Sequence, residues 1–479
     1  SLRNDLRNPE LADAHRFHAG TALASFAPDR LPLSADDRQM ERDLAFLAKQ
    51  LAAVDIREQR YYPYFHRVKE LLRKPLEDLS FCVAAAEPQR LGATRALSEF
   101  FAHDCVLLTR LAGQATFEQY NIVYHKLKAL DKQGRGDELR ELLRGMVAGQ
   151  ASDGIDESGR VELGSKRANA AVTFLRLGER DEALKVLAVG KDPESVTQFV
   201  HRCRKQGVTA AELIDCVERT DQLRLATTGG QRAVHDTVLF GLLLALGNFG
   251  PQELPSPRGA TLVESLERWY QNDPSSAIHS ATGWLLRQWG RDEDVTGMEQ
   301  QARPFSSERE WFVLTVNGRQ GQVEFTDYFT FVVFRRGAFM MGSPDDPPER
   351  DRESDEKAHP VELTQPFAIC DREVTRRQYQ HSQKASSEDG RDWLPQLSIN
   401  WNEAVKYCRW LTKQIGKHEE DQCYASPDSQ AVYEERNGER WPKDWELSDH
   451  HHRTGFRLPT EAEWEFASCY RRKPKKTRQ

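Results

Sequence analysis

The stretch Gly455-Phe-Arg-Leu-Pro-Thr-Glu-Ala-Glu-Trp-Glu-Phe-Ala467 decides the fold of the last third of the chain. It predicts an extended segment followed by a helix that begins after Thr460. Glu463 stands three residues after this cap, so that each side chain can satisfy the other residue's free backbone N–H. Carboxylates are also favoured in the first turn by the helix dipole. The residues after Ala467 turn abruptly basic.

Two further helices upstream carry the same kind of start signal. Thr375 is followed by Gln378, which completes a second capping box. Asn400 is expected to cap a helix that continues to Leu411. Apolar residues recur at helical spacing along this helix and predict one buried face, formed by Ala404, Val405, Cys408 and Leu411.

Segments with the composition of β-strands precede these helices. Residues 311–316, 321–325 and 329–334 are rich in aromatic and β-branched side chains. Asn317-Gly318 is a typical hairpin dipeptide, so a turn is predicted between the first two segments. Three shorter strands are expected at 337–343, 359–363 and 366–369, the first of them ending in a Gly-Ser turn.

Residues from about 10 to about 300 carry helical periodicity. One pattern of Arg, small residues, Leu and Phe recurs at 16–26 and 90–100, with a weaker copy at 167–177. Small residues at this spacing let helices approach closely, and the separation of about 75 residues is near two HEAT-type helix pairs of about 40 residues each. We therefore expect an α-helical, HEAT-like, solenoid-type region. The sequence leaves open whether it binds a protein partner or only spaces its neighbours.

The composition of the chain excludes some classes of function. The chain has 479 residues, a net charge of −7 and 29% charged residues, as expected for a soluble protein that does not bind nucleic acid generally. No apolar run approaches the ~20 residues that span a bilayer, and 238–246 is expected to be a buried helix. The eight cysteines form no CxxC pair, which favours a reduced, cytoplasmic protein. The chain opens on Ser1 rather than Met, so its native start is left open.

Taken together, the motifs of the last third resemble the formylglycine-generating enzyme, or sulfatase-modifying factor, family. Five family elements occur in the family's order within about 140 residues. The residues that carry the resemblance, all expected to be structural, are Phe339, Met341, Gly342, Ser343, His359, Pro360, Glu373, Val374, Thr375, Tyr379, Trp401, Ala404, Tyr407, Cys408, Trp410, Leu411, Arg457, Leu458, Pro459, Thr460, Glu461, Glu463, Trp464 and Glu465.

The resemblance implies an α + (α+β) chain: a helical region over 1–305, part of a C-type-lectin-like α+β domain over 306–470, and a basic tail over 471–479. The matching residues correspond to the first half of a family domain. The helical region in front resembles an arrangement in large bacterial proteins that have a protein kinase domain further upstream. No kinase signature occurs in these 479 residues.

The family's chemistry is expected to be missing from this chain. Members that oxidise a sulfatase cysteine hold copper(I) with two thiolates, and the resemblance places that pair and the calcium ligands after the last helix. We therefore expect no catalytic, cofactor or metal residue here. Cys408 and Cys469 match family positions in or near helices and are expected to be buried structural residues.

Other candidate sites have simpler interpretations. Asp449 and the histidines at 450–452 are expected to form an exposed loop, because adjacent residues cannot all face one ion. The acidic residues at 345–356 lack the spacing of a calcium loop and are expected to be solvated. The basic residues at 471–478 could engage an acidic surface, but the replaced end of a truncated gene is favoured.

Three hypotheses about function follow. The first is a truncated family member with a helical scaffold and no activity. The second is a protein-interaction module of a larger bacterial signalling protein. The third is an oxidase completed by a separate chain. Half of a single-core domain should also leave apolar faces uncovered around Phe331, Val333, Tyr407 and Trp464.

Overall fold

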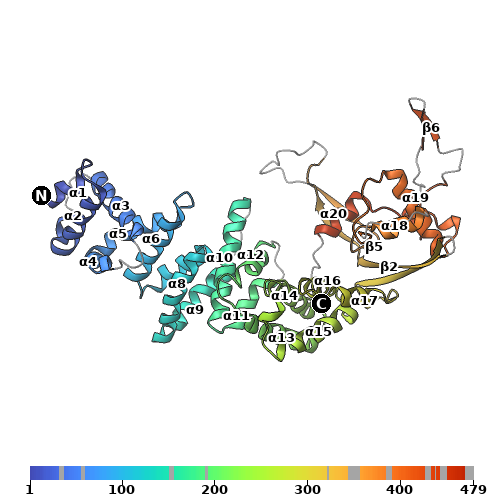
Figure 1. The fold of residues 1–479 in the computed structure, drawn as a ribbon, viewed down its shortest axis with the longest axis horizontal. Helices are drawn as coiled ribbons and strands as arrows, with labels where there is room; N and C mark the ends of the chain where they lie inside the picture. Colours follow the sequence, from blue (N-terminus) through green and yellow to red (C-terminus); the bar gives the residue numbers. More distant parts are fainter. Residues whose placement is uncertain are drawn as a thin grey trace. The chain divides into compact units, whose positions relative to one another are not determined.

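The structure is a computed structural model, and it describes residues 1–31, 37–54, 60–149, 156–188, 193–320, 323–342, 356–383, 391–426, 433–436, 439–442 and 450–469. The chain divides into two compact units, Ser1–Arg258 and Gly259–Gln479. Figure 1 labels the elements along the chain. Ser343, Asp449, the acidic residues 345–355 and the basic tail lie outside the described residues, and so does the side chain of Cys469.

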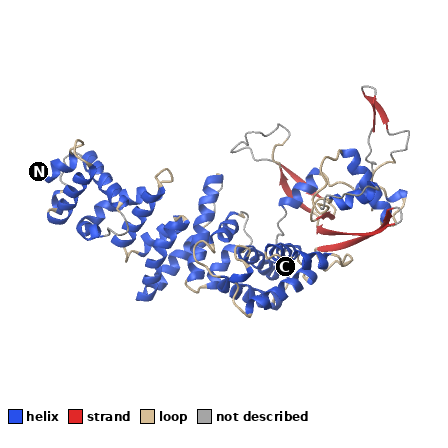
Figure 2. Ribbon diagram, viewed as in Figure 1, coloured by secondary structure: helices blue, strands red, loops and turns tan. Residues whose placement is uncertain are grey.

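The regular secondary structure described in the first unit is all helical (Figure 2). Its α-helices are α1 (Leu2–Arg7), α2 (Asp13–Phe26), α3 (Asp37–Ala53), α4 (Tyr62–Phe65), α5 (Lys69–Phe81), α6 (Glu87–Phe100), α7 (Cys105–Gln114), α8 (Phe117–Leu130), α9 (Gly136–Ala148), α10 (Glu157–Arg176), α11 (Arg180–Leu184), α12 (Glu194–Arg202), α13 (Ala210–Ala226) and α14 (Gly229–Leu246). Short 3-10 turns lie at Pro28–Arg30, His66–Val68, Lys185–Leu187 and Pro251–Glu253, and a π-type turn lies at Asp131–Arg135.

Local signals explain several of these helices. The recurring small residues lie on buried faces, and α6 passes so close to α3 that a Cβ on Gly92 would lie 1.8 Å from the Ala52 carbonyl oxygen. A capping box of Thr209 and Glu212 is present at the start of α13. The predicted apolar helix at 238–246 forms the buried end of α14. The HEAT-like identity of this region stays a prediction.

The second unit combines six described α-helices with small sheets. It begins with α15 (Arg258–Asn272), α16 (Ser276–Gln288) and α17 (Asp292–Glu299). The strands are β1 (Trp311–Gln320), β2 (Val323–Phe334), β3 (Gly337–Met341), β4 (His359–Leu363), β5 (Phe367–Cys370), β6 (Tyr433–Arg436) and β7 (Glu439–Pro442). The remaining helices are α18 (Arg376–Gln383), α19 (Trp401–Gln414) and α20 (Glu461–Cys469), with 3-10 turns at Glu419–Asp421 and His450–His452.

The strands form one three-stranded and two two-stranded antiparallel sheets. The larger sheet has the order β1-β2-β5, while β3 pairs with β4 and β6 with β7. The change from helix to strand falls between Glu299 and Trp311, close to the predicted boundary at 306. Helices α15 to α17 nevertheless belong to the same compact unit as the strands, and the boundary itself stays a prediction.

The hairpin turn was predicted in the wrong place. Asn317 and Gly318 lie inside β1, opposite Thr326 and Phe325, and β2 is one continuous strand where two were expected. The Thr326 hydroxyl donates to the Asn317 side-chain oxygen at 2.9 Å, which suits the pair to a cross-strand position. Glycine is needed at 318 because a Cβ there would lie 2.3 Å from the Phe325 ring.

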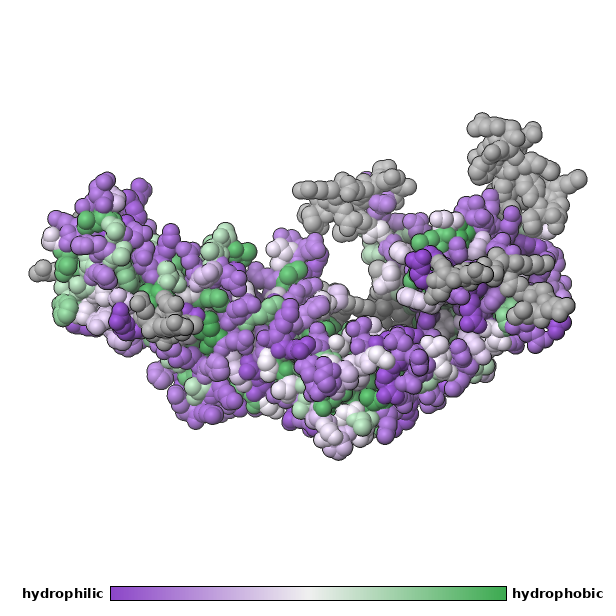
Figure 3. All heavy atoms as spheres, in the orientation of Figure 1, coloured by the Kyte–Doolittle hydropathy of each residue, from purple (hydrophilic) through white to green (hydrophobic). Residues whose placement is uncertain are grey.

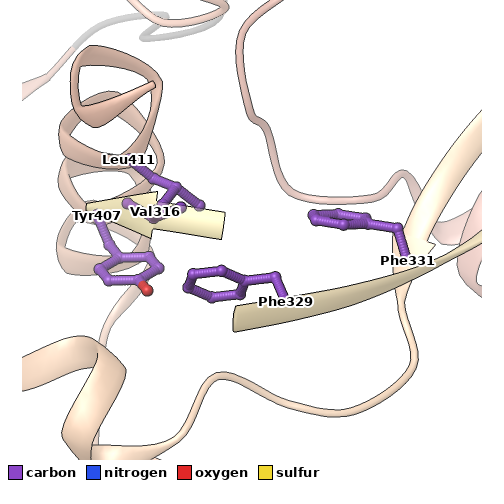
Figure 4. Packing of buried hydrophobic residues seen from close by; sticks show 5 residues of the cluster. All are labelled: Val316, Phe329, Phe331, Tyr407 and Leu411. Carbon is purple, nitrogen blue, oxygen red and sulfur yellow. The ribbon is translucent and has the colours of Figure 1, made fainter. Parts of the chain in front are cut away.

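A hydrophobic cluster holds α19 against the large sheet (Figure 4). Its buried members are Val316, Phe329, Phe331, Tyr407 and Leu411. The expectation that Phe331 and Tyr407 would be poorly covered is wrong, because they are only 7% and 5% exposed. The apolar face of α19 covers this side of the sheet. Val333 is partly buried, whereas Trp464 is 62% exposed, as expected.

The surface is mixed in character. On the face drawn in Figure 3, hydrophilic residues predominate and hydrophobic ones are scattered. Within the described ranges, every helix is too short or too polar for a membrane crossing.

Candidate functional site

The motif around α20 forms a closed set of local hydrogen bonds. The backbone N–H of Thr460 donates to Glu463 at 2.9 Å, and that of Glu463 donates to the Thr460 hydroxyl at 3.2 Å. The Arg457 guanidinium donates to both oxygens of Glu463, at 2.7 and 2.6 Å. Burial opposes ionisation of Glu463, but these hydrogen bonds outweigh it and hold the carboxyl's pKa below its usual range. Glu463 is thus fully occupied by capping.

Side chains on the other turns of α20 fasten it to the β3–β4 sheet. Glu465 accepts a 2.8 Å hydrogen bond from the backbone N–H of Gly342, at the end of β3. The ring of Phe466 lies 5.3 Å from that of Phe339. Glu461 and Trp464 are exposed on the same helix. None of these contacts places a reactive group beside a cavity.

The other predicted caps are also present. Thr375 and Gln378 exchange hydrogen bonds of 2.9 and 3.3 Å at the start of α18. Asn400 and Glu403 do the same at α19, at 2.9 and 3.0 Å. The Gln378 side chain also donates to the carbonyl of Tyr328 in β2, at 3.1 Å. The caps therefore set both the helix starts and the contact of α18 with the sheet.

The remaining family-motif residues are dispersed over the domain. In the β3–β4 pair, Met341 lies opposite His359, and Pro360 lies opposite Met340. Residues that pack around the α19 core are Val374, Tyr379, Tyr407, Trp410 and Leu411. Of the rest, Leu458 packs on a second core cluster. Ala404 is partly exposed, and Trp401, Pro459 and Glu373 are exposed, Trp401 by 45%.

Three described cysteines lie near this core. Cys408 and Cys423 are buried together in one cluster, and the Cys423 thiol donates to the carbonyl of Gly455 at 3.4 Å. Burial raises the pKa of Cys408 to about 12. Burial and the neighbouring Asp371 carboxylate likewise raise the pKa of Cys370 to about 12. A thiol, unlike a thiolate, is a poor ligand for copper(I).

Other metal candidates do not converge. Histidines 450–452 form a 3-10 turn, where Nδ1 of His452 lies 3.3 Å from the Gln365 side-chain nitrogen. Across the part of the chain that the structure describes, no group of three or more His, Cys, Asp and Glu side chains is placed to hold a metal ion.

A network of charged side chains joins helices α15 to α17 to the residues after β5. One oxygen of Glu299 accepts from Arg287 at 2.6 Å, from Arg372 at 2.7 Å and from the Tyr270 hydroxyl at 3.0 Å. Arg372 also holds both oxygens of Asp371, at 3.0 and 2.9 Å. Burial opposes ionisation of Glu299, but the two guanidiniums outweigh it and lower the pKa of its carboxyl.

An aromatic stack reinforces the same junction. The ring of His279 lies between those of Tyr270, at 4.3 Å, and Trp311, at 3.8 Å. Its Nδ1 lies 2.7 Å from the Tyr270 carbonyl, and the indole N–H of Trp311 donates to the Asp273 carbonyl at 2.7 Å. Burial lowers the pKa of His279 to about 4. The imidazole is therefore neutral at pH 7.

This buried histidine predicts acid sensitivity. The unfolded chain binds a proton at His279 near pH 6.5, whereas the folded unit does so only near pH 4. Stability is therefore expected to fall as the pH drops from about 6.5 to about 4, since the unfolded state binds more protons there. Urea unfolding across this range measures the slope. His279→Phe keeps a stacked ring and should flatten it; equal slopes in both proteins would contradict the prediction.

An open cleft of about 650 Å³ lies beside the Glu299 network. Its walls come from α16 and α17, from residues 326–330 of β2, from residues 370–375 after β5, from the start of α18, and from Asp392 and Trp393. Its charged lining comprises the carboxylates of Asp292, Glu299, Asp327, Asp371, Glu373 and Asp392 and the guanidiniums of Arg287, Arg372 and Arg377. The volume lies in the usual range for ligand sites.

Sequence reasoning did not identify this cleft. The local sequence carries no functional motif around four of its residues, Glu299, Arg372, Asp392 and Trp393. The Glu299–Arg372 hydrogen bond joins residues 73 apart in sequence, and no local pattern announces it. The available signals were the motif residues Glu373, Val374 and Thr375, which lie in the cleft wall beside Arg372.

Comparison with known families places a domain in this unit. Residues 319–475 match the model of the sulfatase-modifying factor enzyme 1-like domain. A domain of this kind is therefore present after the helical region. Neither the curated proteins nor the solved structures gave a match to the chain.

Proposed function

We propose that this chain is a binding protein, in which the sulfatase-modifying factor-like domain acts as an interaction module beside a helical scaffold. We further propose that this polypeptide does not itself oxidise a cysteine to formylglycine. The state of the described thiols carries this second part. Copper(I) needs accessible thiolates, because the soft ion must meet both the protein ligands and the substrate thiol.

The described cysteines of the domain do not fit that requirement. Cys408 and Cys423 are 8% and 0% exposed, so a substrate thiol cannot reach a metal held between them. Cys370 borders the cleft, but no second described cysteine lines the cleft beside it. No described pair of cysteines therefore lies where a substrate thiol could reach both. Copper and calcium remain cofactors of complete family members in this proposal.

The binding role is supported by the cleft and by the extensive helical region. Clefts of this size lined by a few converging polar groups are typical ligand sites. Stacked helices offer long surfaces to protein partners, so we place a HEAT-like scaffold within a larger bacterial, kinase-linked, cytoplasmic signalling protein. We propose a protein partner, and neither nucleic acid nor membrane.

The oxidase part is tested by incubating the purified chain with a sulfatase-type cysteine peptide, copper(I) and oxygen. Mass spectrometry is expected to recover the unmodified cysteine peptide, while an active family member run in parallel yields the aldehyde. Substituting serine for Cys370, Cys408 or Cys423 should change nothing. Aldehyde formation that depends on any of these cysteines would refute the proposal.

A further inference from the structure

We propose that the cleft between α17, β2 and α18 binds an arginine or lysine side chain in an extended basic segment of a partner protein. This inference deepens the proposed binding role and rests on it. Four features of the described residues carry it: the charge of the walls, the occupation of the cleft's own guanidiniums, an unsatisfied carboxylate oxygen of Asp392, and an exposed indole.

The walls carry an excess of negative charge. Six carboxylates and three guanidiniums line the cleft. Asp327 is 3% exposed, and its carboxylate already contacts Nδ1 of His381, at 2.7 Å, and Nε of Arg377, at 3.7 Å. A cleft lined mainly by one sign of charge concentrates ligands of the opposite sign.

The cleft's own guanidiniums are already engaged. Arg287 and Arg372 both donate to Glu299, and Arg372 also holds Asp371. Arg377 donates to the Thr326 carbonyl at 3.2 Å, and its Nε lies 3.7 Å from Asp327. Of the six lining carboxylates, Asp292, Glu373 and Asp392 are thus left without a hydrogen bond from any of these three guanidiniums.

One carboxylate oxygen in the cleft lining, Oδ1 of Asp392, has no hydrogen-bond partner among the described residues. A carboxylate oxygen accepts hydrogen bonds and does not donate them, so the group that would satisfy it is a donor.

The exposed indole of Trp393 supplies the remaining contact. It is 73% exposed, although tryptophan is usually well buried. Trp393 follows Asp392 directly, and both residues line the cleft. A guanidinium or ammonium stacked on this face would reach the carboxylates with its N–H groups. A donor-rich cation satisfies all four features together.

The test uses the full chain and a hexa-arginine peptide, with hexa-citrulline as the uncharged analogue of equal shape. Calorimetric titration should show binding of hexa-arginine that weakens as salt is added, and no binding of hexa-citrulline. Trp393→Ala and the double variant D392N/E373Q should each weaken binding about fivefold or more. The matched controls are Trp464→Ala, an exposed tryptophan outside the cleft, and Glu308→Gln, an exposed carboxylate outside it.

Equal losses in the cleft variants and the controls would overturn the proposal, as would binding of hexa-citrulline. Spermine binding as tightly as hexa-arginine would overturn the assignment to a peptide side chain. Trp393 is exposed, so its variant keeps the test valid even if the Asp392 variant unfolds. Aldehyde formation in the oxidase assay bears only on the proposed function, so the two failures are distinguishable.

Discussion

Replacing Phe329 with alanine is expected to destabilise the second unit by about 3–5 kcal/mol, the usual cost of deleting a buried aromatic ring. Phe329 is 4% exposed and belongs to the cluster with Val316, Tyr407 and Leu411 that fixes α19 on the sheet. Its loss leaves a cavity between strand and helix that the pleated backbone of β2 cannot close. The neighbouring cleft should become less well defined for the same reason.

Hydrogen exchange of β1, β2 and α19 measures this effect within the second unit, independently of the helical one. The matched control is Phe305→Ala, because Phe305 is 62% exposed and contacts one ring, that of Phe312. We expect the control to cost less than about 1.5 kcal/mol, the upper value of such a ring contact. Equal losses of protection in both variants would show that the cluster does not hold α19.

Substituting alanine for Glu299 is expected to cost about 2–3 kcal/mol, because it removes the shared acceptor of two guanidiniums and a phenol. The Glu299 side chain is 19% exposed, but Arg287 and Arg372 are 33% and 43% exposed. Solvent therefore screens part of the positive charge that Arg287 and Arg372 keep when Glu299 is removed. The loss of unfolding free energy should stay below that of breaking a fully buried ion pair. Urea unfolding at pH 7 measures it.

Glu293 provides the control for this substitution, since it is an exposed carboxylate on the same helix. Glu293→Ala should change the free energy of unfolding by less than about 1 kcal/mol. Arg372→Ala and the double variant with Glu299→Ala complete a mutant cycle. The destabilisations caused by the two single substitutions, Glu299→Ala and Arg372→Ala, should sum to more than the destabilisation of the double variant, because the two residues share one interaction. Strict additivity would contradict the network.

The sequence located most elements of the domain but not their pairing. The strands 337–343, 359–363 and 366–369 were predicted nearly as the structure has them. The turn at Asn317-Gly318 was wrong, because a cross-strand hydrogen bond and the Phe325 ring outweigh local turn preference. Coverage of Phe331 and Tyr407 was also misjudged, since burial depends on how α19 lies across the sheet.

By itself, the sequence determined the three capped helices of the domain and, through the motif that ends at Ala467, the family of residues 319–475. Capping joins a residue to one three positions away, so the information is local. Tertiary structure alone decided the Glu299 network, the stack on His279 and the cleft beside Trp393. Their groups are brought together from α15 to α18 by packing, and burial sets their charge and pKa only after the chain has folded.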